Sequence, residues 1–137
     1  MIELDRSIYD GLIDHARAVA PNEACGILAG HVEEDRSRVT ARYPTENAAE
    51  QPEAEYLIDP EQQLALFERI EAAGESIVGF YHSHPGGPPA PSETDRKHAA
   101  WPGKSYVIVA MDGKPFVGSW RWRATTERFD PEPVQVD

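Results

Sequence analysis

The sequence contains very little cysteine and few basic residues. Cys25 is the only cysteine, so no disulfide can form within the chain and no site can be built from several thiolates. Thirteen Lys and Arg stand against 24 Asp and Glu, which gives a formal net charge of -11. Nucleic acids and anionic membrane surfaces both attract a clustered basic face. The composition therefore predicts a reducing, cytoplasmic setting and partners that are neither nucleic acid nor membrane.

Lysine and long apolar runs are also scarce. Ten of the 13 basic residues are Arg. An acidic, Lys-poor surface is typical of proteins from salt-rich cytoplasm, although an ordinary acidic cytosolic protein has the same charge balance. No segment approaches the roughly 20 apolar residues of a membrane span, and the N-terminal sequence MIELDRSIYDGL does not resemble a signal peptide. We therefore expect neither an anchor nor a leader.

The periodicity of apolar residues predicts one mixed α/β domain over residues 1–137. The chain is 40% hydrophobic, which suffices for a modest core. Asp59 and Pro60 have the residue types of a helix cap and first turn, which predicts a helix running to Gly74. Further helices are predicted over 5–20 and 92–100, a loop over 45–55, strands over 23–31, 37–44, 76–84, 106–110 and 116–123, and a weaker strand or tail over 129–136. This order of elements predicts a mixed sheet with helices packed around it.

Two histidines near the end of the predicted strand 76–84 point to a metal site. His82 and His84 are separated by a single residue, so a strand directs both imidazoles to the same face. The Pro/Gly-rich segment 85–91 forms a fixed loop that returns the chain to a helix start bearing Asp95. Three nitrogen and oxygen ligands with an open position are typical of catalytic zinc, whereas closed structural sites usually include thiolates. We predict that one zinc ion binds His82, His84 and Asp95, which indicates a metal-dependent peptidase or amidohydrolase.

Each of these residues also has a simpler explanation when taken singly. A histidine at a strand end is often a solvent-touching polar residue, and Ser92 with Asp95 is a common helix-capping pattern. The joint arrangement of the histidine pair, the rigid loop and the acid-bearing helix start is what favours a metal site.

Hydrolysis of an amide also needs a base that takes a proton from water and passes it to the leaving amine. Glu23 is the candidate because it stands at the edge of a predicted buried strand, where an unpaired carboxylate is costly. A surface glutamate after a helix is the alternative reading of this position.

Together these positions resemble the motif of the JAMM (MPN+) zinc metalloproteases. The motif residues are Glu23, the sequence His-Ser-His-Pro at 82–85, and Ser92 with Asp95, and the segments EACGILAG and GFYHSHP resemble the family's flanking sequences. The resemblance implies an MPN fold, a curved mixed sheet flanked by helices in a cytidine-deaminase-like arrangement. It also implies that His82, His84 and Asp95 hold zinc, that Glu23 is the general acid/base, and that Ser92 hydrogen-bonds the oxyanion of the reaction.

The resemblance further implies a class of substrate. Members of the family cleave after the C-terminal Gly-Gly of ubiquitin-like modifier proteins, and this short, acidic chain is most similar to the desampylases of salt-adapted archaea. A related bacterial branch instead releases cysteine from a sulfur-carrier protein. A third alternative is a non-catalytic MPN module that binds a partner, which is disfavoured because all five motif positions are filled. The motif leaves the modifier, the linkage selectivity and the oligomeric state open.

Overall fold

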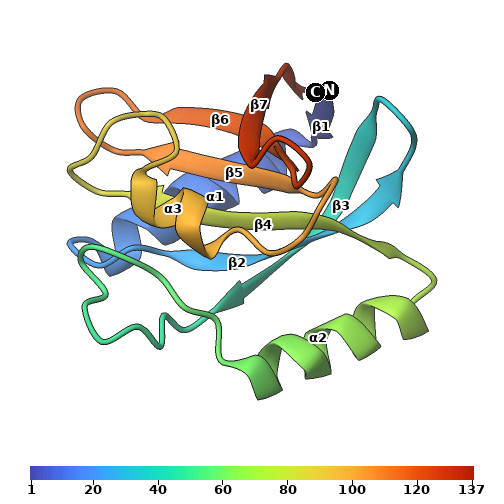
Figure 1. Cartoon of the computed structure of the whole chain (residues 1–137), viewed down its shortest axis with the longest axis horizontal. Coiled ribbons are helices and arrows are strands. Elements are labelled where there is room, and N and C mark those ends of the chain that lie inside the picture. The colour runs from blue at the N-terminus through green and yellow to red at the C-terminus, as the bar shows by residue number, and fades with distance from the viewer.

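The computed structural model describes all 137 residues, which form one curved sheet of eight strands and three helices (Figure 1). The strand order across the sheet is β7-β6-β5-β4-β2-β3-β1-β8. In chain order the elements are β1 (Ile2–Leu4), α1 (Arg6–Val19), β2 (Cys25–Val32), β3 (Ser37–Thr45), α2 (Pro60–Ala72), β4 (Ser76–His84), α3 (Glu93–His98), β5 (Ser105–Ala110), β6 (Phe116–Arg123), β7 (Arg128–Glu132) and β8 (Val134–Val136). The predicted mixed α/β architecture is confirmed.

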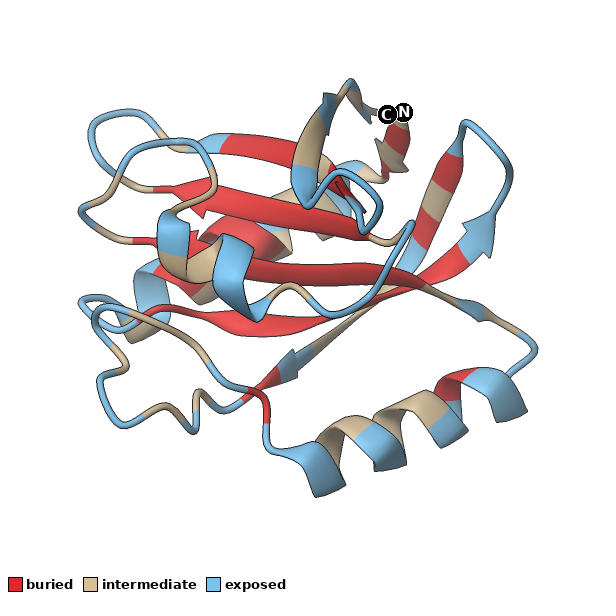
Figure 2. Ribbon diagram, viewed as in Figure 1, coloured by how far each residue is buried: buried red, intermediate tan, exposed pale blue.

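The core lies on both faces of the central strands, which are the most completely buried part of the molecule (Figure 2). One cluster packs α1, through residues such as Leu12 and Ala16, against Val107 and Val109 of β5. The other packs Ile70 of α2 on the opposite face. The helices α1 and α2 therefore pack on opposite faces of the sheet. Figure 1 shows α3 in front of the central strands and α1 behind them. None of the three helices has the length and hydrophobicity of a membrane span.

Strand β4 occupies the middle of the sheet, antiparallel to β2 and parallel to β5. The approach of the neighbouring main chains is very close at two glycines. A Cβ atom on Gly79 would lie 1.8 Å from the carbonyl oxygen of Ser105, and one on Gly30 would lie 1.9 Å from that of Arg38. Glycine is therefore required at both positions, as expected where another backbone approaches a strand.

Several details of the chain differ from the prediction. The strand at 23–31 starts at Cys25, because the main chain of Glu23 bonds to a loop instead of a neighbouring strand. The C-terminal segment is two strands on opposite edges of the sheet, β7 and β8, separated by Pro133, which has no N–H to donate to a ladder. Strand β1 was not predicted, because three residues are too short to show a period.

The capping predictions for the two later helices match the structure. The Asp59 carboxylate accepts a hydrogen bond from the amide of Gln62 at 3.1 Å, and Pro60 occupies the first helical turn. Helix α3 is shorter than expected and ends at His98, but its N-cap is Ser92. The start of α3 is thus fixed by its own side chains, which matters for the site described below.

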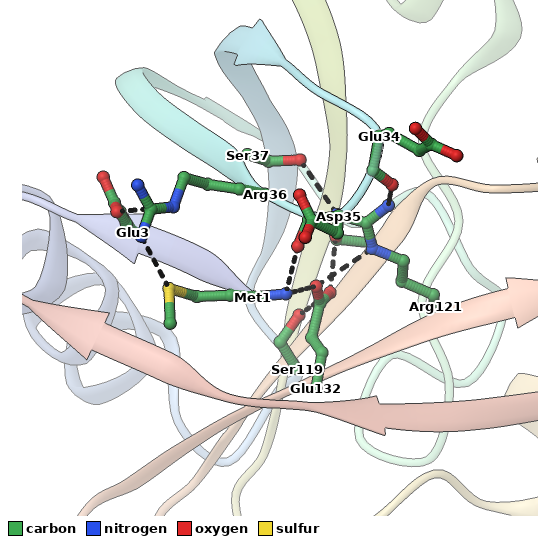
Figure 3. Close-up of polar contacts among 10 residues, drawn as sticks. Met1, Glu3, Glu34, Asp35, Arg36, Ser37, Ser119, Arg121 and Glu132 are labelled. Carbon is green, nitrogen blue, oxygen red and sulfur yellow. Dashed lines mark hydrogen bonds and ion pairs between the residues drawn. The ribbon is translucent and has the colours of Figure 1, made fainter.

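A buried ion pair between Arg121 and Glu132 joins β6 and β7 near Met1 (Figure 3). Glu132 of β7 has a side chain only 5% exposed, and it accepts hydrogen bonds from the hydroxyls of Ser105 at 2.7 Å and Ser119 at 2.8 Å. Arg121 of β6 pairs with it at 3.0 Å and also donates to Ser37 of β3 at 3.2 Å. Because β5, β4 and β2 lie between β6 and β3 in the sheet order, the contact spans the inside of the curve. Although burial alone raises the pKa of Glu132, these hydrogen bonds hold it below its ordinary value.

We predict that Glu132→Ala lowers the free energy of unfolding by about 3 kcal/mol, because removal of one partner leaves the other charge of a buried pair uncompensated. Urea unfolding followed by circular dichroism measures the change. Glu53→Ala, at an exposed glutamate, serves as the control. Equal stability of the two variants would contradict a structural role for the ion pair.

Candidate metal centre

His82 and His84 lie at the carboxyl end of β4 with their rings on the same face. Their Nε2 atoms are 3.1 Å apart, and both residues are buried. The alternation of a strand gives them this shared direction, and the pairing of β4 with β2 and β5 keeps the strand from moving. The pair therefore presents two nitrogen atoms to one point in space.

Asp95 reaches this point from the first turn of α3. One carboxylate oxygen lies 3.1 Å from Nε2 of His82, and the other lies 3.1 Å from Nε2 of His84. The same side chain belongs to a capping box: the amide of Ser92 donates to it at 2.9 Å, and the amide of Asp95 donates to the Ser92 hydroxyl at 3.1 Å. The capping pattern and the metal-ligand pattern are therefore one geometry, in which the cap fixes the orientation of the carboxylate.

The pKa shifts of Asp95 and His82 favour their metal-binding forms, whereas for His84 the effect of burial is outweighed by hydrogen bonds with Asp95 and the Pro88 carbonyl, which raise the pKa. The Nδ1 atom of His84 is 2.9 Å from the carbonyl oxygen of Pro88, which accepts a hydrogen bond from a protonated Nδ1 and leaves Nε2 free to act as a ligand. Burial alone raises the pKa of Asp95, but hydrogen bonds with His82 and His84 hold it well below its ordinary value. Burial lowers the pKa of His82. The deprotonated forms that metal ligation requires are thus the favoured forms of Asp95 and His82.

Glu23 lies two residues before the first residue of β2 and completes the group. Glu23 is 6% exposed, and one of its carboxylate oxygens is buried without a hydrogen-bond partner. A carboxylate oxygen of Glu23 and a ring nitrogen from each of His82 and His84 all lie within 4.8 Å of one another. Burial raises the pKa of Glu23 to about 7, with a lowering contribution from His84 and a raising one from Asp95. A carboxyl group with such a pKa can accept and release a proton near neutral pH.

Ser83 fixes Glu23 relative to the histidines. Its hydroxyl accepts a hydrogen bond from the amide of Ala24 at 2.7 Å, and its own amide donates to the carbonyl oxygen of Ala24 at 3.0 Å. Ser83 lies between the two histidines, so its two hydrogen bonds to Ala24 hold the residue that follows Glu23 beside them.

The donor set fits a zinc ion. Ligand atoms in a tetrahedral zinc site are about 3.3 Å apart, and the contacts among His82, His84 and Asp95 are 3.1 Å. The unpartnered oxygen of Glu23 supplies a proton acceptor next to the group. Two imidazoles and one carboxylate, with a further acid at hand, are the ligand types of a hydrolytic zinc site that keeps one position open.

One aromatic residue of this site was not predicted from the sequence. Tyr56, in the loop between β3 and α2, stacks on the ring of His82 with the two centroids 4.4 Å apart and the planes at 21°. Beyond Tyr56 lies a cavity of about 560 Å³, bordered by Phe80, Trp101 and Tyr106 among others. Tyr56 lies between the predicted loop 45–55 and the predicted helix cap at Asp59, where no periodicity reveals such a contact.

Comparison with known proteins identifies the chain. The family model described as prokaryotic homologs of the JAB domain matches residues 5–124. The chain belongs to this family. It is 45% identical to a desampylase of Haloferax volcanii, over 99% of this chain and 96% of the relative, and 38% identical to a CysO-cysteine peptidase of Mycobacterium tuberculosis, over 94% and 86%. The JAMM family is zinc-dependent, and these relatives make the chain a JAMM-type hydrolase.

Solved structures agree with this assignment. A protein from Desulfitobacterium hafniense superposes with a TM-score of 0.89 at 32% identity, over 100% of this chain and 93% of the other. A JAB1/MPN domain protein from Archaeoglobus fulgidus superposes with a TM-score of 0.59 at 17% identity, over 100% and 97%, and shares the fold. The predicted MPN fold and the resemblance to the JAMM family are both confirmed.

The raised pKa of Glu23 leads us to predict how the Tm of protein stripped of metal by a chelator depends on pH. The folded state favours the protonated carboxyl group, so its stabilising contribution is complete below the ordinary pKa of 4.5 and is lost as the pH rises through about 7. We expect the Tm of the stripped wild-type protein to fall relative to that of Glu23→Gln as the pH rises from about 5 to about 8. Differential scanning calorimetry measures the Tm of both proteins, and parallel profiles of Tm against pH would contradict the raised pKa of Glu23.

Proposed function

We propose that this chain is a zinc-dependent isopeptidase that cleaves after the C-terminal Gly-Gly of a ubiquitin-like modifier protein. One zinc ion per chain binds His82, His84 and Asp95, Glu23 is the general acid/base, and Ser92 hydrogen-bonds the developing oxyanion. The observation that carries the proposal is the convergence of Glu23 with the three candidate ligands around one point. The 45% identity to the Haloferax desampylase supports removal of a small modifier as the reaction.

Zinc, when bound, supplies a positive charge that acidifies a water molecule and polarises the carbonyl group of the substrate. Glu23 takes the proton of the attacking water on its free carboxylate oxygen and delivers it to the leaving amine. In the metal-free protein burial raises the pKa of Glu23 to about 7, so the carboxyl group is far less acidic than an exposed glutamate and is suited to holding a proton between the two transfers. Glu23 thus acts as base and then as acid in a single turnover.

Ser92 serves the same reaction through its hydroxyl group. The oxygen accepts the capping hydrogen bond from the amide of Asp95, which leaves the hydroxyl hydrogen free to donate to the carbonyl oxygen of the substrate. A donor held by a helix cap is already oriented before the charge develops, and such a donor stabilises the transition state more than the ground state.

The surroundings of the site suit an extended peptide tail. The cavity beside Tyr56 is mainly apolar and offers room for side chains that precede a Gly-Gly end. The negative overall charge disfavours nucleic acid and anionic membranes as partners, and we propose that the partner is a cytoplasmic protein. We propose that the whole of residues 1–137 forms this single MPN domain.

A second candidate substrate is a sulfur-carrier protein that bears cysteine at its C-terminus. The 38% identity to the CysO-cysteine peptidase of Mycobacterium tuberculosis supports it. The two candidates share the Gly-Gly end and differ in the leaving amine, which is a lysine side chain in one and free cysteine in the other. Offering both adducts to the same preparation separates them.

We predict that purified protein binds one zinc ion per chain and cleaves a fusion joined through a Gly-Gly tail. Glu23→Ala retains the zinc while kcat falls by a factor of about 1,000 or more, because it removes the proton acceptor and spares the ligands. Atomic emission gives the zinc content, and gel analysis gives the cleavage rate. Cleavage that persists after thorough chelation would exclude the zinc mechanism, and full activity of Glu23→Ala would exclude the assigned base.

A separate prediction concerns Ser92. Ser92→Ala lowers kcat about 100-fold with little change in KM, because the hydroxyl acts mainly in the transition state. Ser92→Thr keeps both the hydroxyl and the helix cap and retains most of the activity. If the alanine and threonine variants are equally impaired at full zinc content, the hydroxyl does not contribute as assigned.

A further inference from the structure

One side chain organises the loop between β3 and α2. The side-chain nitrogen of Asn47 lies 3.1 Å from the carbonyl oxygen of Glu23, 2.9 Å from that of Glu55 and 3.3 Å from that of Pro52. The two hydrogens of this NH₂ group are thus shared among three carbonyl oxygens, two within the loop and one of Glu23 before β2. Asn47 therefore joins the loop to the residue proposed as the catalytic base.

The side-chain oxygen of Asn47 is engaged as well. It accepts hydrogen bonds from the amide of Ala49 at 3.0 Å and from the amide of Leu57 at 3.1 Å. All the donors and both acceptor positions of the side chain are therefore in use, and every partner is a main-chain atom. An irregular loop has no ladder to satisfy its main chain, so this one depends on Asn47 to do so.

The loop holds both main-chain polar groups of Glu23. The Glu23 amide donates to the carbonyl oxygen of Pro52 at 2.7 Å, and the Glu23 carbonyl accepts from Asn47. On the other side, Ser83 holds the next residue, Ala24. The position of the Glu23 carboxylate is thus fixed from the sheet by Ser83 and from the loop by Asn47.

Asn47 also fixes the residue that covers His82. Its side chain bonds the carbonyl of Glu55 and the amide of Leu57, which are the two neighbours of Tyr56 in the chain. The Tyr56 ring stacks on His82 at a centroid distance of 4.4 Å. The Asn47 side chain therefore fixes the loop both against Glu23, the proposed base, and, through Tyr56, against His82, a candidate ligand.

We propose that Asn47 is a positioning residue that holds Glu23 and Tyr56 in register with the His82–His84 pair through the loop 46–59. It touches neither the substrate nor the metal-binding atoms, and it acts only by placing the groups that do. The proposal rests on the proposed function, because the rate of hydrolysis is one of its readouts.

Asn47→Asp is the sharpest test, because it keeps the size of the side chain and replaces both donors with a carboxylate oxygen facing three carbonyls. Asn22→Asp is the matched control. Asn22 is the only other asparagine, it is exposed, it makes no side-chain hydrogen bond, and it precedes Glu23 directly. Both variants add the same charge next to Glu23, which Asn22 precedes in the chain and Asn47 contacts through a hydrogen bond.

We expect kcat of Asn47→Asp for a Gly-Gly-tailed fusion to fall about 100-fold, since small displacements of a catalytic group cost about this much. Zinc content stays at one per chain, because the candidate ligands come from β4 and α3. Hydrogen exchange of the amides of Glu23, Ala49 and Leu57 becomes faster, while that of the central strands does not change. Asn22→Asp behaves as the wild-type protein in all three measurements.

Several outcomes would overturn the proposal. A kcat equal to that of Asn22→Asp shows that the position does not matter for the reaction, and a parallel loss of zinc shows a general structural role. Asn47→Ser, which is smaller and uncharged, replaces the aspartate variant if the latter does not fold. If neither folds, Asn47 supports the whole fold and the positioning role is wrong.

The two proposals fail in distinguishable ways. If the wild-type protein cleaves neither the Lys-linked nor the cysteine adduct, the proposed function is wrong and the exchange measurement still decides the role of Asn47. Unchanged protection of the Glu23 amide in Asn47→Asp would then overturn the positioning role by itself.

Discussion

The antiparallel pairing of β2 with β4 is the constraint on which the rest of the structure depends. It sets Cys25 opposite His82, so Glu23 arrives beside a histidine pair that is far from it in sequence. A slip of one residue would turn both histidines to the other face of the sheet. The double hydrogen bond between Ser83 and Ala24, at the edge of this pairing, keeps the register where the chemistry requires it.

Local physics explains which parts of the site were predictable from the sequence. The shared face of His82 and His84 follows from the period of a strand, and the place of Asp95 follows from a helix start after a stiff loop. Burial of Glu23 was predicted from its apolar neighbours. The contacts of Asn47 and Tyr56 were not predicted, because they depend on how a loop without periodicity folds back on distant residues. The ion pair of Glu132 with Arg121 was not predicted either, because it depends on the register of β7 on β6, and residues 129–136 were expected only as a weak strand or tail.

The segment between β4 and α3 does more than reverse the chain. The carbonyl oxygen of Pro88 meets the ring of His84, and the helix cap that follows orients Asp95. Both contacts use groups that a turn and a helix end must satisfy anyway. The same hydrogen bonds thus complete the backbone and hold the proposed ligands, so the site needs little additional structure to stay in place before a metal binds.

The loop 46–59 has a property that follows from how Asn47 holds it. Every bond that this side chain makes ends on a main-chain atom, so the shape of the loop does not depend on the identity of most of its side chains. Several of those side chains border the cavity beside the site. Substitutions of the exposed side chains of this loop can therefore change the chemical character of the cavity wall without disturbing the hydrogen bonds that hold Glu23.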